Sequence, residues 1–234
     1  MEKESKWIRF VIIAIIILFV VQGSYGSDKM VALTFDDGPN GNTDTLLDIL
    51  EDKDVTATFF VVGRMVEKYP QLLEEIFNGG HEISNHTYSH PNLTMLSPRE
   101  IIYELDRTRG LIREVIGKDP HFFRPPGGKY NQRILKIAEA AGYTMVMWDI
   151  NTNDLTSSPE KIYREIVNQA EDGDIVLLHN GTTNTIEIIG KVIDKLREKG
   201  FGFATVSEIF QRRNIEGAYL GNRLWGEEGR DCIE

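Results

Sequence analysis

Short apolar runs, rich in β-branched and aromatic residues, alternate along the chain with longer stretches of helical pattern. The apolar runs lie at 31–35, 57–62, 82–84, 122–124, 144–148, 174–178 and 201–205. The helical stretches lie between them, at 45–53, 65–77, 97–116, 131–141, 158–170 and 186–199. Strands that alternate with helices in this way predict a parallel sheet joined by right-handed crossovers.

Local signals support these helices. Ser97-Pro98-Arg99-Glu100 is typical of a capping box with proline in the first turn, and Gly142 and Gly200 each follow a helical stretch. In a chain of 234 residues, we expect the seven predicted strands to close into a distorted, incomplete (β/α)7 barrel. An open, doubly wound sheet is the alternative.

The first 27 residues are predicted to be a signal peptide or a membrane anchor. Lys3, Lys6 and Arg9 precede an apolar run at 10–21, which is shorter than the roughly 20 residues of a full membrane span. Either way, the preceding positive charges place the remaining chain outside the cytoplasm. We expect a single domain at 28–213 and a peripheral tail at 214–234.

Composition excludes several classes of protein. The formal net charge is −10 and no Lys/Arg cluster stands out, which argues against a nucleic-acid partner. Hydrophobic residues make up 41% of the chain, enough for a folded core. The single cysteine, Cys232, excludes an intrachain disulfide and a multi-cysteine metal site. We expect a monomer.

Polar side chains follow five of the predicted strands at their carboxyl ends. In a barrel of this kind those ends converge on one face. The residues are Asp36, Asp37, His86, His90, Arg124, Asn151, Asp154 and His179. Coincidence can place one or two polar residues there, whereas polar clusters at five strand ends indicate a functional site.

His86 and His90 are four positions apart, so their imidazoles can converge in a helical turn or a tight loop. One of the two adjacent aspartates, Asp36 or Asp37, can complete a set of two histidines and one carboxylate, while the other handles a proton. Such a set can hold a divalent cation with open positions, as in catalytic zinc sites. Non-haem iron oxygenases use the same set, but the alternating pattern argues against their usual folds.

Two further motifs have both functional and structural explanations. Arg124 precedes two prolines and two glycines, which stiffen the loop and allow a ligand to approach its N–H groups. His179 ends a buried strand. A solvated arginine on a rigid turn and a core histidine are the structural alternatives. His81 and His121 lack such settings, and we expect both to be structural or surface residues.

Together, these residues resemble the polysaccharide deacetylase family, the NodB-homology domain of carbohydrate esterase family 4. The resemblance spans about residues 29–210, and five motifs occur in family order at 34–39, 86–90, 124–128, 151–155 and 177–179. It implies Asp36 as general base and Asp37, His86 and His90 as metal ligands.

The same resemblance implies that Arg124 braces the base, that His179 is the general acid and that Leu177 lines the acetyl pocket. The backbone N–H of Gly127 is our candidate oxyanion donor. Two motifs depart from the family pattern. In the fourth, Asn151 replaces an acid that supports Arg124 or His179, and Leu155 replaces a groove-lining tryptophan; in the third, Gly127 stands where the family often has an aromatic residue. Because Asn151 carries no charge, we expect His179 to lack a carboxylate partner and to lose its proton at a lower pH than in a relative with aspartate there. Asp149 or Asp154 reaching the same place is the alternative.

The implied activity is metal-dependent removal of N-acetyl groups from an amino-sugar polymer, peptidoglycan first and chitin-type oligosaccharide second. We expect Zn²⁺, with Co²⁺, Ni²⁺ or Mn²⁺ as alternatives. The alternative function is a weakly active or inactive homologue that serves as a cell-wall-binding or sporulation factor. Asn151 and Leu155 motivate that alternative, and the intact remainder of the motifs argues against it.

Overall fold

The computed structural model describes residues 29–221 of the chain. The predicted targeting segment at 1–27 and Cys232 therefore lie outside the described residues. In the described part, no helix has both the length and the apolar character needed to cross a membrane.

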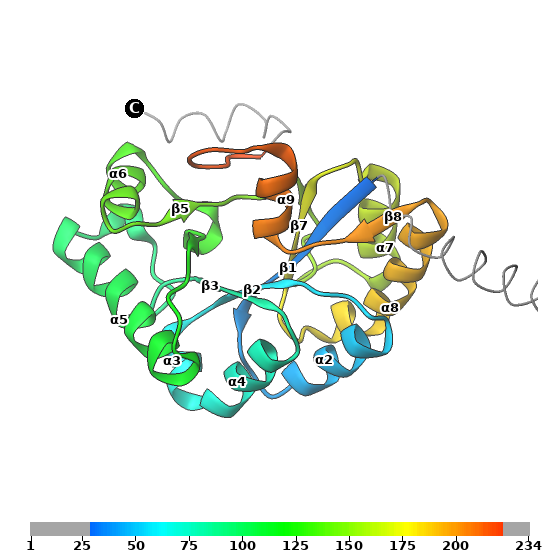
Figure 1. The fold of residues 1–234 in the computed structure, drawn as a ribbon, viewed down its shortest axis with the longest axis horizontal. Helices are drawn as coiled ribbons and strands as arrows, with labels where there is room; N and C mark the ends of the chain where they lie inside the picture. Colours follow the sequence, from blue (N-terminus) through cyan, green and yellow to red (C-terminus); the bar gives the residue numbers. More distant parts are fainter. Residues whose placement is uncertain (1–28, 222–234) are drawn as a thin grey trace, which may run out of the picture.

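One curled, parallel sheet runs through the described residues, with helices packed around it (Figure 1). The strands are β1 (Lys29–Gly38), β2 (Thr58–Val61), β3 (Glu82–Asn85), β4 (Phe122–Phe123), β5 (Thr144–Met145), β6 (Ile150–Asn151), β7 (Asp174–His179) and β8 (Phe201–Phe203). Their order is β5-β4-β3-β2-β1-β7-β6, and β8 pairs with the first residues of β1.

The sheet curls because its two edges are consecutive in the chain. Only residues 146–149 join β5 at one edge to β6 at the other. A linker this short spans at most about 18 Å, at roughly 3.6 Å per residue. The edges must therefore face each other, which confirms the predicted α/β fold with an incomplete barrel.

Helices surround the sheet and connect successive strands (Figure 1). They are α2 (Thr43–Asp52), α3 (Gly63–Lys68), α4 (Pro70–Asn78), α5 (Pro98–Ile116), α6 (Gln132–Ala140), α7 (Pro159–Gln169), α8 (Thr183–Glu198) and α9 (Val206–Arg213). Two short 3-10 helices, η2 (Leu93–Met95) and η3 (Pro126–Gly128), lie in connecting loops.

Alternation along the strands separates an outer core from an inner one. Leu33 and Phe35 of β1 pack in a cluster that includes buried residues of α2, α4, α7 and α8. Ala32 packs inside the barrel with Ile175 of β7 and Phe210 of α9. By the same alternation, the inward-facing positions nearest the carboxyl end of β1 and β7 are Asp36 and His179.

Two predicted elements differ from the structure. Of the predicted strand at 144–148, only Thr144–Met145 forms a strand, β5, because residues 146–149 cross from one edge of the sheet to the other and lead into β6 at 150–151. The predicted helix at 65–77 is broken into α3 and α4 at Tyr69, whose φ is −134°. Pro70 causes the break, because proline disfavours the helical conformation in the preceding residue.

Part of the tail that we expected to be peripheral is built into the fold. Tyr219 is buried, its backbone N–H donates to the carbonyl of Met145 at the end of β5, and its carbonyl accepts the N–H of Met147 just beyond β5. Its hydroxyl donates to Asp149, whose Oδ2 accepts the N–H of Ile175 on β7. Tyr219 thus links the two edges of the sheet.

Candidate active site and metal centre

The carboxyl ends of the strands meet at one opening of the barrel, which we call the mouth. Asp36 lies there beside His179, its partner in the register of β1 and β7. The register between β1 and β2 shifts between Asp36 and Gly38, and Asp37 has a left-handed φ of 71°. Neighbouring side chains on a regular strand point to opposite faces, and this irregularity lets both aspartates serve one site.

Asp37, His86 and His90 come together as the sequence predicts. One ligand atom from each lies within 4.8 Å of the other two. The Nε2 atoms of His86 and His90 are 3.5 and 3.1 Å from Asp37 Oδ1. The closer contact is not aligned as a hydrogen bond, so this buried oxygen accepts none within the described residues. A buried carboxylate oxygen that faces two imidazole nitrogens without a donor fits a divalent cation.

The tautomer of His86 also suits a metal ligand. Its Nδ1 lies 2.8 Å from the carbonyl oxygen of Arg124, which can only accept, so Nδ1 donates. Burial lowers the pKa of His86 and favours the neutral ring. The lone pair is then on Nε2, the atom that faces Asp37. A hydrogen bond of this kind fixes the ring orientation of metal-binding histidines.

Electrostatics keep the carboxylate of the triad ionised. Burial alone would raise the pKa of Asp37, but the adjacent His90 and the charges of His86 and His179 lower it to about 2. The pKa of His90 is raised, chiefly by its contact with Asp37. A proton and a cation therefore compete for His90, so acidification should weaken cation binding at this site.

The backbone around the triad is strained. Asp37, Thr87 and His90 have φ values of 71°, 68° and 57°. Left-handed conformations cost non-glycine residues roughly 1–3 kcal/mol each and persist only when surrounding contacts impose them. Such strain is common at functional sites.

Arg124 is fully buried inside the barrel, where each of its nitrogens finds an acceptor. Its Nη1 donates to Asp36 Oδ1 at 2.7 Å and to Thr34 Oγ1 at 2.8 Å. Its Nε and Nη2 donate to the carbonyls of Val146 and Met147, where the chain crosses between the sheet edges. The predicted link between Arg124 and Asp36 is therefore present, and the solvated alternative is wrong.

His179 has a carboxylate partner that we had named only as an alternative. Its Nδ1 lies 2.7 Å from Asp154 Oδ1, and its backbone N–H donates to Asp154 Oδ2. Burial lowers the pKa of His179, but the bond to Asp154 and nearby carboxylates raise it overall. Thr185, in the first turn of α8, donates to Asp154 Oδ2 at 2.5 Å. The expectation that His179 lacks a carboxylate partner was therefore wrong, because Asp154 takes that position.

Asp149, Asn151 and Asp154 lie close together in the chain but make different hydrogen bonds. Asp149 binds Tyr219 and the backbone of Ile175, away from His179. Asn151 Oδ1 accepts the N–H of Asn153 and so caps its own loop. Residue order could not separate Asp149, Asn151 and Asp154, because all three follow or end neighbouring short strands.

The remaining predicted site residues lie on or below the loops of the mouth. Gly127 is exposed in η3 with a φ of 61°, and its N–H makes no hydrogen bond inside the described structure. Leu177 is buried on β7 and pairs with Asn151 of β6. Leu155 is 61% exposed.

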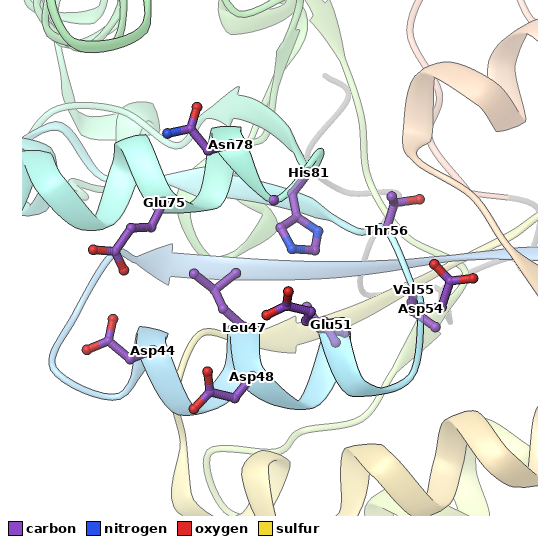
Figure 2. A pocket seen from close by; sticks show the side chains of 12 residues that line it. Asp44, Leu47, Asp48, Glu51, Asp54, Val55, Thr56, Glu75, Asn78 and His81 are labelled. Atoms are coloured by element: carbon purple, nitrogen blue, oxygen red, sulfur yellow. The ribbon is translucent and has the colours of Figure 1, made fainter.

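His81 lies away from this site, as predicted. It lines a groove of about 570 Å³ between α2 and α4, among the side chains of Leu47, Glu51 and Glu75 (Figure 2). Its Nδ1 accepts the N–H of Ala57, and burial lowers its pKa to about 4. None of the predicted site residues lines this groove.

The mouth therefore combines a triad that could hold a cation with two groups suited to proton transfer, which is the equipment of a metal-dependent hydrolase. The sequence matches the polysaccharide deacetylase family profile over residues 23–146. A peptidoglycan-N-acetylglucosamine deacetylase of Bacillus cereus is 34% identical over 195 residues, covering 80% of this chain and 91% of that protein. A bifunctional xylanase/xylan deacetylase of Cellvibrio japonicus is 36% identical over 172 residues, covering 73% of this chain and 26% of that protein.

The structural comparison agrees with the sequence match. The solved peptidoglycan deacetylase PdaC from Bacillus subtilis superposes with a TM-score of 0.75 at 34% identity, covering 80% of this chain and 92% of that chain. This chain belongs to the polysaccharide deacetylase family. The resemblance inferred from the motifs is confirmed, and with it the prediction of a hydrolytic enzyme of this family.

Proposed function

We propose that this protein hydrolyses N-acetyl groups on the amino sugars of peptidoglycan. The observation that carries the proposal is Asp37 Oδ1, which is buried, accepts no hydrogen bond from residues 29–221 and faces the Nε2 atoms of two histidines. The names of two relatives, both peptidoglycan deacetylases, support the substrate. Chitin-type oligosaccharide is the second candidate.

The cation site would be formed by Asp37, His86 and His90. We propose Zn²⁺, because one carboxylate and two imidazoles with open positions suit it, and Co²⁺, Ni²⁺ and Mn²⁺ are alternatives. When bound, the cation would supply Lewis acidity toward the acetyl carbonyl and lower the pKa of a water molecule.

The proton transfers are assigned to residues of the mouth. Arg124 holds Asp36 through Oδ1, which leaves Oδ2 to take a proton from water as the water oxygen bonds to the acetyl carbon. The N–H of Gly127 donates to the carbonyl oxygen as negative charge develops on it. When the C–N bond breaks, His179 Nε2 gives its proton to the leaving nitrogen, and acetate and a free amine result.

The departures from the family pattern concern the substrate groove rather than this chemistry. We propose that Leu177 lines the acetyl pocket and that exposed Leu155 borders the path of the glycan. Asn151 would act on the groove indirectly, through the turn that it caps. We further propose that the enzyme works outside the cytoplasm, secreted or anchored through residues 1–27, where its proposed substrate lies.

Acetate release from peptidoglycan, acetylated chito-oligomers and acetylated xylan tests this proposal, with and without a chelator. We expect release from peptidoglycan, loss of release with chelator, and recovery on adding Zn²⁺. Release of acetate from xylan alone would mean that xylan, rather than peptidoglycan, is the substrate. No release from any glycan by cation-loaded protein would favour the alternative function, a weakly active or inactive homologue that serves as a cell-wall-binding or sporulation factor, for which Asn151 and Leu155 are the motivating residues.

A further inference from the structure

We propose that Glu104 is a positioning residue for the cation site, acting through Ser89 on the neighbouring ligand His90. This inference rests on the cation site of the proposed function. Glu104 lies on α5, outside the five motifs, and it is buried with 7% of its surface exposed. A buried carboxylate is costly unless its oxygens accept hydrogen bonds, so its partners indicate what it is there to hold.

Among the described residues, the Glu104 carboxylate accepts hydrogen bonds from Ser89 alone. The backbone N–H of Ser89 donates to Oε2 and its hydroxyl donates to Oε1, each at 2.7 Å. Two charge-assisted hydrogen bonds to one residue fix its orientation as well as its position. The next residue along the chain is His90, so this clamp acts one peptide unit from a predicted ligand.

The loop that carries the histidines needs such a clamp because it is strained. Thr87 and His90 both have positive φ values, 68° and 57°. The first half of the loop is held by the N–H groups of Gly63 and Arg64, which donate to the carbonyls of Thr87 and Tyr88. These bonds reach the loop from the start of α3. No bond of this kind reaches Ser89 within the described residues, and Ser89 is held instead by Glu104 of α5.

Inside the loop, His90 has one backbone anchor. Its N–H donates to Thr87 Oγ1 at 3.2 Å, a bond between two residues that are themselves strained. Without Glu104, Ser89 and His90 can relax together toward ordinary backbone angles. The His90 ring would then leave its position 3.1 Å from Asp37 Oδ1, and cation binding would have to restore the strained loop.

The opposite end of the barrel offers a matched control. Glu82, at the start of β3, holds Ser207 at the start of α9 in the same way. Its Oε2 accepts the N–H of Ser207 at 3.2 Å, and its Oε1 accepts the Ser207 hydroxyl. Loss of the Glu82 clamp should therefore cost stability without touching the cation site.

Two measurements on the full-length protein test the inference. One is cation affinity, measured by chelator competition, and the other is the visible spectrum of the Co²⁺ form. We expect Glu104→Gln to weaken Zn²⁺ binding 10–100-fold, the range for residues that hold a metal ligand in place. The amide would turn its NH₂ toward one of the two Ser89 donors. The Co²⁺ spectrum should change as well, because the position of His90 changes.

Two further variants separate positioning from general stability. Ser89→Ala keeps the backbone bond to Glu104 and should weaken Zn²⁺ binding less than Glu104→Gln does; it also carries the test if Glu104→Gln does not fold. Glu82→Gln should lower the melting temperature and leave Zn²⁺ affinity and the Co²⁺ spectrum unchanged.

Each alternative outcome has a distinct meaning. Equal Zn²⁺ affinity in wild type and Glu104→Gln would overturn the inference and leave the proposed function standing. Equal weakening by Glu104→Gln and Glu82→Gln would show a stability effect and would also overturn it. A wild-type protein that binds neither Zn²⁺ nor Co²⁺ would overturn the cation site itself.

Discussion

The two ends of the barrel are built by different backbone rules. At the amino end, the turns that lead into β3, β4, β5, β7 and β8 contain glycines with positive φ: Gly80, Gly117, Gly142, Gly173 and Gly200. Glycine adopts such angles without strain. Asp54, before β2, is the exception among these turns. At the mouth, Gly127, Gly128 and Gly181 also have positive φ, but here positive values fall in addition on side chains that do chemistry or border it, including Asp37, Thr87 and His90.

Polar side chains repeat the contrast. At the amino end, His81 accepts an N–H from Ala57 and Glu82 holds both Thr58 and Ser207. At the mouth, Asp37 Oδ1 is buried beside two imidazole nitrogens and has no hydrogen bond in the part of the chain that the structure describes. Strain and an unsatisfied ligand atom thus occur together at the end where the family motifs lie. The amino end is built for stability, and the mouth gives up stability to hold ligands.

Removing a cation ligand should show the largest difference between a change at the mouth and a change at the amino end. We expect Asp37→Ala to lose the single bound cation and, with it, nearly all deacetylase activity, because two histidines alone make an incomplete site. Elemental analysis and acetate release measure the two effects. Asp54→Ala is the matched control, since it removes an aspartate with positive φ at the amino end. Full cation occupancy in Asp37→Ala would disprove the assigned ligand set.

Asp36→Asn separates the two adjacent aspartates. The variant should keep its cation and lose activity by a factor on the order of 10²–10⁴, the usual contribution of a general base. It should also be less stable, because buried Arg124 loses the charge that neutralises it. Cation content, thermal unfolding and acetate release distinguish these effects. Loss of the cation would mean that the roles of the two aspartates are reversed.

Asp154→Asn tests the pairing with His179 through pH dependence. The bond to Asp154 raises the pKa of His179, so an amide there should lower it. The imidazolium is then lost at lower pH, and the alkaline limb of kcat/KM should move to lower pH. We expect activity at neutral pH to fall about tenfold. Asn151→Asp is the control, and its profile should superimpose on that of the wild type. An unmoved limb in Asp154→Asn would rule out the charge argument.

The smallest expected effect is at the amino end. Gly200→Ala meets no atom within 4 Å but must adopt a φ of 83°. It should cost about 1–2 kcal/mol of unfolding free energy, the usual penalty of a left-handed residue. Denaturant titration measures this loss, while cation affinity and kcat should stay at wild-type values. A change in either would show that the two ends are coupled.

The sequence alone was enough for the α/β alternation and for the candidate ligands. Apolar residues that recur every second position, or about every 3.6 positions, are local signals of strands and helices. Polar residues at the carboxyl ends of parallel strands converge on one face, whatever segments lie between them in the chain. For this reason Asp37, His86 and His90 could be predicted as a set, although adjacent Asp36 and Asp37 could not be told apart by spacing. Their separate roles came from the family resemblance and remain proposals.

Tertiary structure alone decided which residues support that set. Asp154 rather than Asn151 or Asp149 meets His179, Glu104 of α5 clamps Ser89, and Tyr219 links the two sheet edges. These partners are 25, 15 and 70 residues apart in the chain, and local pattern carries no information about such contacts. They depend on strand register, on the bulge at Asp37 and on the curl of the sheet, which are set by packing of the whole barrel.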